Sequence, residues 1–282
     1  MPGLEAACHY TTASVHDVGG DFYDVFPLGA GRWAFFLGDV SGRGAPAAAL
    51  ASLIRYTLRS TALLERVRAL NSALLSASSD GSGLCTLVFG TLAPEPAGGF
   101  ALTLAGGGHL PAHHLRPARR DGPDRAVART EPVSLAGEML VGALHHADFV
   151  FRAVQLLPGE ALCLYSNGLT EARPSQGARF GERGLTAHLT HHAATNRALG
   201  AATIISDLTS LLDSSPAGSP DDVALLALSA TSATPATAPS GASGTAHTSL
   251  PFPLPAPDTA AQTEEQVAPS AGEPGCVGPH GH

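Results

Sequence analysis

Short apolar runs alternate with turn-like segments along the first 230 residues of the chain. Trp33–Val40 is a nearly continuous apolar run that follows Gly29–Gly31, so together with Asp21–Pro27 it predicts a buried hairpin. Four more apolar runs predict further strands: Leu84–Leu92, Phe100–Leu104, Ala161–Ser166 and Val223–Leu228. Proline and glycine separate the first two of these four runs, as is typical of a connection between strands.

The segment Pro46–Leu75 has a different pattern. Its apolar residues recur three and four positions apart, as at Leu50, Leu53, Ile54 and Leu58, which predicts one or two amphipathic helices. Hairpin-like strands interrupted by a helical block favour an α+β fold over a doubly wound parallel sheet, in which strands and helices would alternate regularly. We therefore predict a layered α-β-β-α sandwich of antiparallel sheets flanked by helices.

The composition of the chain changes at about residue 230. From there Ala, Pro, Ser, Thr and Gly dominate, and no arginine follows Arg197. Such a segment cannot bury enough apolar surface to offset the entropy lost on ordering it. We expect one folded domain over residues 1–229 and a disordered tail over residues 230–282. An alternative is an interaction protein in which the tail is the functional part and the domain its anchor.

Composition and charge exclude several classes of function. Of the 282 residues, 44% are hydrophobic and 14% charged, which is compatible with a globular fold. The net charge of −8 and the scattered arginines provide no basic stripe for a phosphate backbone, so no nucleic-acid partner is expected. We find no apolar stretch of about 20 residues and no basic-then-apolar leader, so we expect a cytoplasmic protein with no membrane partner.

The four cysteines argue against a zinc site or a disulfide framework. Cys8, Cys85, Cys163 and Cys276 stand far apart, with no paired spacing. Buried or chemically idle thiols are the interpretation that we adopt.

Four segments place a carboxylate or an amide at a strand end beside glycine or proline. They are Val18–Asp24, Gly38–Gly44, Tyr165–Glu171 and Pro220–Val223. Strand ends can bring carboxylates that are distant in sequence together, and glycine lets the backbone approach a bound ion closely. Because Mg²⁺ and Mn²⁺ prefer carboxylate, carbonyl and water ligands, we expect an all-oxygen site for a hard cation. For any single segment, a turn or a helix cap is the alternative.

In order and spacing these segments resemble the motifs of the SpoIIE/RsbU branch of the PPM-type metal-dependent protein serine/threonine phosphatases. Gly19–Asp24 and Gly38–Gly44 look like the two opening motifs of that family. The similarity runs from about residue 3 to residue 229. It continues through Ala105–Pro111, Leu157–Glu160, Ser166–Arg173 and Asp221–Leu226.

The resemblance implies a site and a reaction. Asp39 corresponds to a carboxylate that bridges two Mn²⁺ or Mg²⁺ ions, the Val40 carbonyl to a ligand of one ion, and Asp221 to a ligand of the other. Asp21 is expected to act mainly through a metal-bound water. Asp21, Asp39 and Asp221 are thus the expected catalytic residues. The implied chemistry is direct hydrolysis of a phosphoester by a metal-activated water, without a covalent protein intermediate.

Asn167 departs from the family pattern, which has a metal-binding aspartate at this position. An asparagine oxygen can still ligate a hard cation, but the lost negative charge is expected to weaken the affinity. Two functions therefore stay open: an active phosphatase that requires more metal, and a weak or inactive phosphatase fold that binds a signalling partner. The resemblance implies a partner that is a phosphorylated STAS-domain anti-sigma-factor antagonist or a similar phosphoprotein, in a sigma-factor or stress-signalling pathway.

A Ser-His hydrolase built on Ser41 or Ser166 with His109 is disfavoured because neither serine lies in a nucleophile-elbow pattern. We expect His109 to anchor a turn. The histidine pairs at 113–114, 145–146 and 191–192 are expected to be solvated. Pro46–Leu75 corresponds by position to the regulatory helices of the family, with core-covering helices and a homodimer surface as the other interpretations.

Overall fold

The computed structural model describes residues 2–13, 19–42, 44–60, 65–77, 83–119, 127–135, 139–147, 149–173, 179–214 and 219–231. The strands are β1 (Leu4–Thr11), β2 (Asp21–Gly29), β3 (Arg32–Val40), β4 (Cys85–Pro94), β5 (Phe100–Gly107), β6 (Ala112–Arg119), β7 (Val127–Val133), β8 (Phe151–Leu156), β9 (Ala161–Tyr165) and β10 (Val223–Ala230). The helices are α1 (Gly44–Ser60), α2 (Arg66–Ala77), α3 (Asn167–Glu171), α4 (Gly181–Thr195) and α5 (Ala201–Asp213).

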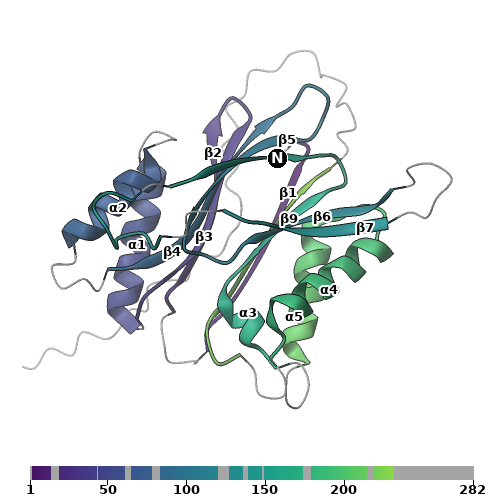
Figure 1. Cartoon of the computed structure of the whole chain (residues 1–282). Helices are drawn as coiled ribbons and strands as arrows, with labels where there is room; N and C mark the ends of the chain where they lie inside the picture. Colours follow the sequence, from purple (N-terminus) through teal and green to yellow (C-terminus); the bar gives the residue numbers. More distant parts are fainter. Residues whose placement is uncertain are drawn as a thin grey trace, which may run out of the picture. The chain divides into compact units, whose positions relative to one another are not determined.

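The strands form two five-stranded sheets. One has the order β1-β10-β9-β6-β7 and the other the order β2-β3-β4-β5-β8. Every pairing between neighbouring strands is antiparallel. Figure 1 shows α1 and α2 on one side of the sheets and α4 and α5 on the other. The predicted α+β sandwich of antiparallel sheets flanked by helices is confirmed.

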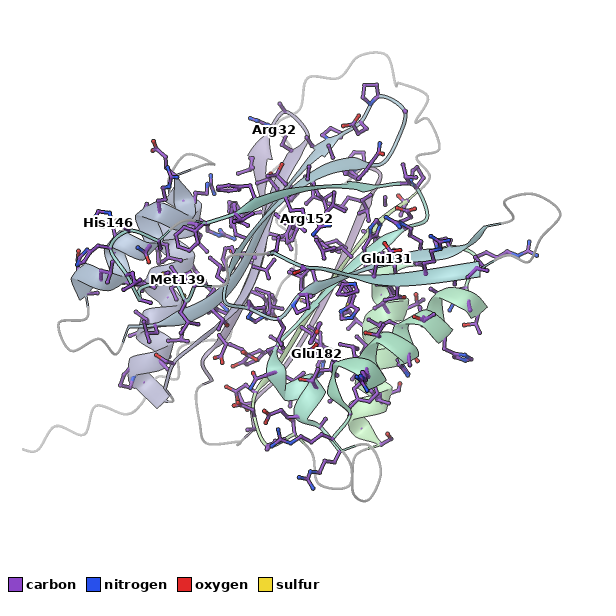
Figure 2. All side chains as sticks on the ribbon, in the orientation of Figure 1. Arg32, Glu131, Met139, His146, Arg152 and Glu182 are labelled. Carbon is purple, nitrogen blue, oxygen red and sulfur yellow. The ribbon has the colours of Figure 1, made fainter. Side chains whose placement is uncertain are left out.

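Three hydrophobic clusters hold these layers together. The first lies between the sheets and contains Phe35, Leu37 and Leu226. The second packs α1 and α2 on the β2-β3-β4-β5-β8 sheet, and Met139 contacts it beside the helix pair (Figure 2). The third packs α4 and α5 on the β1-β10-β9-β6-β7 sheet. Ile54 belongs to the second cluster, so the predicted helical block covers a core.

The longest apolar runs of the sequence are strands that are buried on both faces. In β10 all eight residues are buried, because alternate residues enter the cluster between the sheets and the cluster under α4 and α5. In β3, Phe35 and Leu37 face the other sheet, whereas Phe36 and Val40 face α1 and α2. A strand between two apolar layers needs apolar residues at every position, which explains why these strands could be predicted.

The histidine pairs are not uniformly solvated as expected, and this prediction was wrong for three residues. His113 and His114 in β6 and His192 in α4 are buried. Each has a partner: His113 bonds to Thr186, His114 to Glu160, and His192 to Asp207. These bonds replace part of the hydration that the imidazoles lose on burial. Among the described residues, His113 Nδ1 and His192 Nε2 are buried without a hydrogen-bond partner.

The described part of the chain ends just after β10. Strand β10 ends at Ala230, and the Thr231 N–H donates to the Gly3 carbonyl. From residue 232 on, the tail that was predicted over residues 230–282 lies outside the described residues, as does Cys276. Cys85 and Cys163 are buried free thiols, and Cys8 is half-buried. No helix within the described ranges is long and apolar enough to cross a membrane.

Candidate active site

Asp21 and Asp39 lie opposite each other at one end of the β2-β3 hairpin. They are direct partners in the antiparallel register, Asp21 as the first residue of β2 and Asp39 as the last but one of β3. Gly20 keeps the space between them open. A Cβ atom on Gly20 would come within 2.8 Å of the Val40 carbonyl oxygen and 2.9 Å of Asp39 Oδ1. Glycine therefore leaves room where these two oxygens converge.

The second half of the site comes from the other sheet, where β9 leads into α3 beside the start of β10. Ser166 Oγ accepts the Ala224 N–H at 2.9 Å and lies 3.3 Å from the Asp222 carbonyl oxygen. A Cβ atom on Gly168 would lie 2.0 Å from that same carbonyl oxygen, so only glycine allows α3 to approach β10 this closely. The two motifs that the sequence separates by some 50 residues are thus docked on each other.

Asn167 and Asp221 meet across this junction. The Asn167 Nδ2–H donates to Asp221 Oδ2 over 3.0 Å. Both side chains are half-buried. For Asn167 to ligate a cation shared with Asp221, its amide would have to turn and present its oxygen.

Asp222 joins the two halves of the site. Its carboxylate accepts the Gly20 N–H at 3.1 Å and the Ala13 N–H at 2.9 Å. Gly20 directly precedes β2 in one sheet, and Asp222 directly precedes β10 in the other. Sequence reasoning assigned no separate role to Asp222. The pattern of two adjacent aspartates does not show which of them accepts backbone N–H groups from the segment before β2.

Asp21 is a buried carboxylate whose pKa is shifted by its surroundings. This side chain is 5% exposed. Burial raises its pKa from 3.8 to about 8, opposed by a hydrogen bond with Ser166 and reinforced by the negative charges of Asp39, Asp222 and Asp221. Carboxylates from both sheets therefore lie close enough to Asp21 to act on it.

The residues present fit a hard cation by their chemistry. Within the described part of the chain, Asp21 Oδ2 is a buried oxygen without a hydrogen-bond partner. Such an atom is costly unless an ion, a proton or a water satisfies it. The surrounding donors are carboxylate and carbonyl oxygens, which suit Mg²⁺ or Mn²⁺ rather than zinc. Among the described residues, no three His, Cys, Asp or Glu side chains already form a closed metal-binding group.

The residues of the alternative Ser-His hydrolase are engaged elsewhere. Ser166 Oγ is bound to the backbone of β10. His109 Nδ1 bonds to Thr86 Oγ1 at 2.7 Å, and its Nε2 bonds to the Tyr165 carbonyl oxygen at 3.1 Å. His109 thus contacts two strands rather than a serine nucleophile, which agrees with an anchoring role.

Comparisons with known proteins place this arrangement in a family. The sequence model of the family Stage II sporulation protein E (SpoIIE) matches residues 29–231. Protein IcfG of Synechocystis sp. is 26% identical over an alignment of 204 positions, and the match covers 61% of this chain and 30% of IcfG. The chain therefore spans about a third of the length of this curated relative.

Solved structures share the fold. The structure of the RsbU and RsbW domains of Rv1364c from Mycobacterium tuberculosis matches with a TM-score of 0.65 and 26% identity, over 83% of this chain and 62% of that one. The PP2C phosphatase domain of SpoIIE from Bacillus subtilis, solved with a fragment of its regulatory domain, gives a TM-score of 0.58 at 16% identity, over 80% and 63%. RsbX in complex with magnesium gives 0.55 at 11% identity, over 80% and 94%.

The family match covers most of the folded part of the chain, and the two-sheet sandwich is that of the solved PP2C domains. The resemblance drawn from the sequence motifs is confirmed. The chain belongs to the SpoIIE family and carries a phosphatase domain of the PP2C (PPM) type.

Proposed function

We propose that this chain hydrolyses phosphoserine and phosphothreonine on a protein in a metal-dependent reaction. The observation that carries the proposal is the pairing of Asp21 and Asp39 across β2 and β3, with the buried Oδ2 of Asp21 lacking a hydrogen-bond partner among the described residues. Family membership and the magnesium complex of RsbX support a divalent cation at this place. A pair of bound Mn²⁺ or Mg²⁺ ions would activate a water and neutralise charge on the phosphoryl oxygens.

Each residue of the site has a proposed role. Asp39 would bridge the two ions, with the Val40 carbonyl on one and Asp221 on the other. Asp21, which is buried, would act mainly through a water bound to one of the ions. Asn167 would complete the set with its amide oxygen. Ser41, next to Val40, is exposed, so a phosphorylated segment can approach from this side.

The proposed substrate is a phosphorylated STAS-domain antagonist of an anti-sigma factor, or a similar signalling phosphoprotein in the cytoplasm. Support comes from the Rv1364c structure, in which an RsbU phosphatase-type domain and an RsbW domain occur on one protein. A second structure with this fold is described as part of the bacterial stressosome. Both support a signalling pathway as the setting, and partner switching is the mode that we propose.

A second candidate function is binding of a phosphoprotein without hydrolysis. It is favoured by one contact, the hydrogen bond from Asn167 to Asp221, which occupies a carboxylate oxygen that the reaction needs for metal. In this case Asp221 would be held by the amide, and the site would recognise a partner without turning it over.

Phosphatase activity tests the first candidate against the second. We would measure hydrolysis of p-nitrophenyl phosphate and of a phosphoserine peptide across a manganese titration. The proposal predicts metal-dependent turnover that Asp39→Ala abolishes and that Asp213→Asn, an exposed carboxylate at the end of α5, preserves. Turnover no higher than that of Asp39→Ala at any manganese concentration, combined with retained peptide binding, would select the second candidate.

A further inference from the structure

His109 touches both sheets next to the proposed metal site. It follows β5 after Gly108, whose segment forms a parallel bridge to Leu87 of β4. The Nδ1 atom of His109 lies 2.7 Å from Thr86 Oγ1 in β4, and its Nε2 atom lies 3.1 Å from the Tyr165 carbonyl oxygen in β9. One imidazole therefore spans from the sheet that carries Asp39 to the strand that leads into Asn167.

The partners of His109 fix its tautomer. A backbone carbonyl can only accept a hydrogen bond, so Nε2 carries the proton. Burial lowers the pKa of His109 to about 4, so the ring is neutral at physiological pH and Nδ1 is an acceptor. The Thr86 hydroxyl must then donate its hydrogen to Nδ1. Thr86 Oγ1 also lies 3.5 Å from the Asp39 carbonyl oxygen, but the 2.7 Å bond to the imidazole is the shorter one and takes the hydrogen.

This direction of donation matters for Asp39. Thr86 and Asp39 are direct register partners in β3 and β4. The Asp39 N–H donates to Thr86 Oγ1 at 3.2 Å. Because the hydroxyl hydrogen points to His109, the lone pairs of Thr86 Oγ1 are oriented towards the Asp39 amide. The chain of donors runs from Asp39 N–H to Thr86 and from Thr86 to His109, and His109 in turn donates to Tyr165.

We propose that His109 is a positioning residue for Asp39, acting through the Thr86 hydroxyl. It holds the backbone of Asp39, the carboxylate that would bridge the two ions, and it ties that backbone to strand β9, which leads into Asn167 at the start of α3. The hydrogen bonds alone carry the inference that His109 positions Asp39. The expected effect on metal binding rests in addition on the proposed function. His109 does not act as an acid or base on the substrate, because both of its ring nitrogens are already engaged.

The proposal predicts different effects for two substitutions of His109. In His109→Asn, the amide oxygen replaces Nδ1 and can still accept from Thr86. In His109→Gln, the amide nitrogen replaces Nε2 and can still donate to Tyr165, but the acceptor for Thr86 is lost. A role through Thr86 predicts that His109→Gln and Thr86→Val weaken manganese binding by about three- to tenfold, the effect of one lost hydrogen bond. His109→Asn should recover most of that loss.

The test uses calorimetric titration of manganese into the full chain, with His191→Gln, an exposed histidine of α4, as the matched control. The double variant of His109→Gln and Thr86→Val should bind manganese no more weakly than either single variant, since both break the same chain of bonds. Equal losses in the Asn and Gln variants, or additive losses in the double variant, would overturn the proposal and leave His109 as a packing residue.

A second readout does not depend on metal. In a chelator, amide hydrogen exchange at Asp39 should accelerate several-fold in Thr86→Val and His109→Gln relative to the natural chain, and less in His109→Asn. Unchanged exchange at Asp39 in both of the first two variants would overturn the link between His109 and Asp39. If the natural chain binds no manganese, the proposed function fails, while the exchange rates still decide whether His109 positions Asp39.

Discussion

Replacing Asn167 by aspartate should make the protein less stable without metal and more stable with it. In the structure the Asn167 amide donates to Asp221 Oδ2 at 3.0 Å. The substitution removes this donor and sets two carboxylates face to face. A hydrogen bond to a charged group contributes about 1.5–3 kcal/mol. Two unit charges about 3 Å apart repel by about 5 kcal/mol at an effective dielectric constant of about 20.

The lost hydrogen bond and the charge repulsion do not act at full strength, because both side chains are half-buried and can turn apart into water. We expect a loss of about 2 kcal/mol in a chelator, which lowers the melting temperature by about 4–8 °C for a domain of this size. With manganese the added charge becomes a ligand, so the manganese affinity should rise by about tenfold or more. The turnover of p-nitrophenyl phosphate at limiting manganese should rise with it.

Differential scanning fluorimetry in EDTA and in millimolar manganese measures both halves of this prediction. Asn196→Asp is the matched control, because Asn196 caps the end of α4, where its side chain bonds to His192 and Thr195 of that helix. The reasoning is refuted if Asn167→Asp melts like the natural chain in EDTA, or if manganese stabilises it no more than it stabilises the control.

Three further predictions follow from the site. In a chelator, the free energy of unfolding should fall by up to about 1.4 kcal/mol per pH unit between about pH 4 and pH 8, because folded Asp21 keeps its proton to about pH 8 while the unfolded chain loses it near 3.8. Urea titrations of Asp21→Asn should lack this fall and those of Asp213→Asn should keep it; the same slope in both variants would refute the assignment. Gly168→Ala should cost about 1–3 kcal/mol, since its Cβ would meet the Asp222 carbonyl oxygen, and an unchanged urea midpoint would contradict this. Manganese should raise the melting temperature of the natural chain but not that of Asp39→Ala, and an equal rise in both would place the ion elsewhere.

The strands that were easiest to predict from the sequence are those with the same apolar environment on both faces. Strands β3 and β10 are covered by apolar layers on both faces, so their composition alone marks them. Strand β1 lies at a sheet edge, where half-exposed small and polar residues hide the pattern. Strand β6 carries buried histidines, which read as solvated because their partners Thr186 and Glu160 are distant in the chain.

The candidate site likewise combines residues that local sequence indicates with contacts that it does not. Asp21, Asp39, Asn167 and Asp221 were expected at the site because their segments resemble family motifs, and their binding of metal stays a prediction. The support of Asp39 by Thr86 could not be predicted, because a threonine in a strand is an ordinary β-former and its bond partner depends on register. Local sequence thus identifies candidate ligands, whereas the contacts that orient them depend on the tertiary structure.

Diffraction at the manganese absorption edge from crystals soaked in Mn²⁺ tests the central claim most directly. We predict anomalous peaks within coordination distance of carboxylate oxygens of both Asp39 and Asp221, with Asp21 on the buried side of the site. Peaks only at other surface carboxylates, with Asp21, Asp39 and Asp221 unchanged and without bound manganese, would contradict the account.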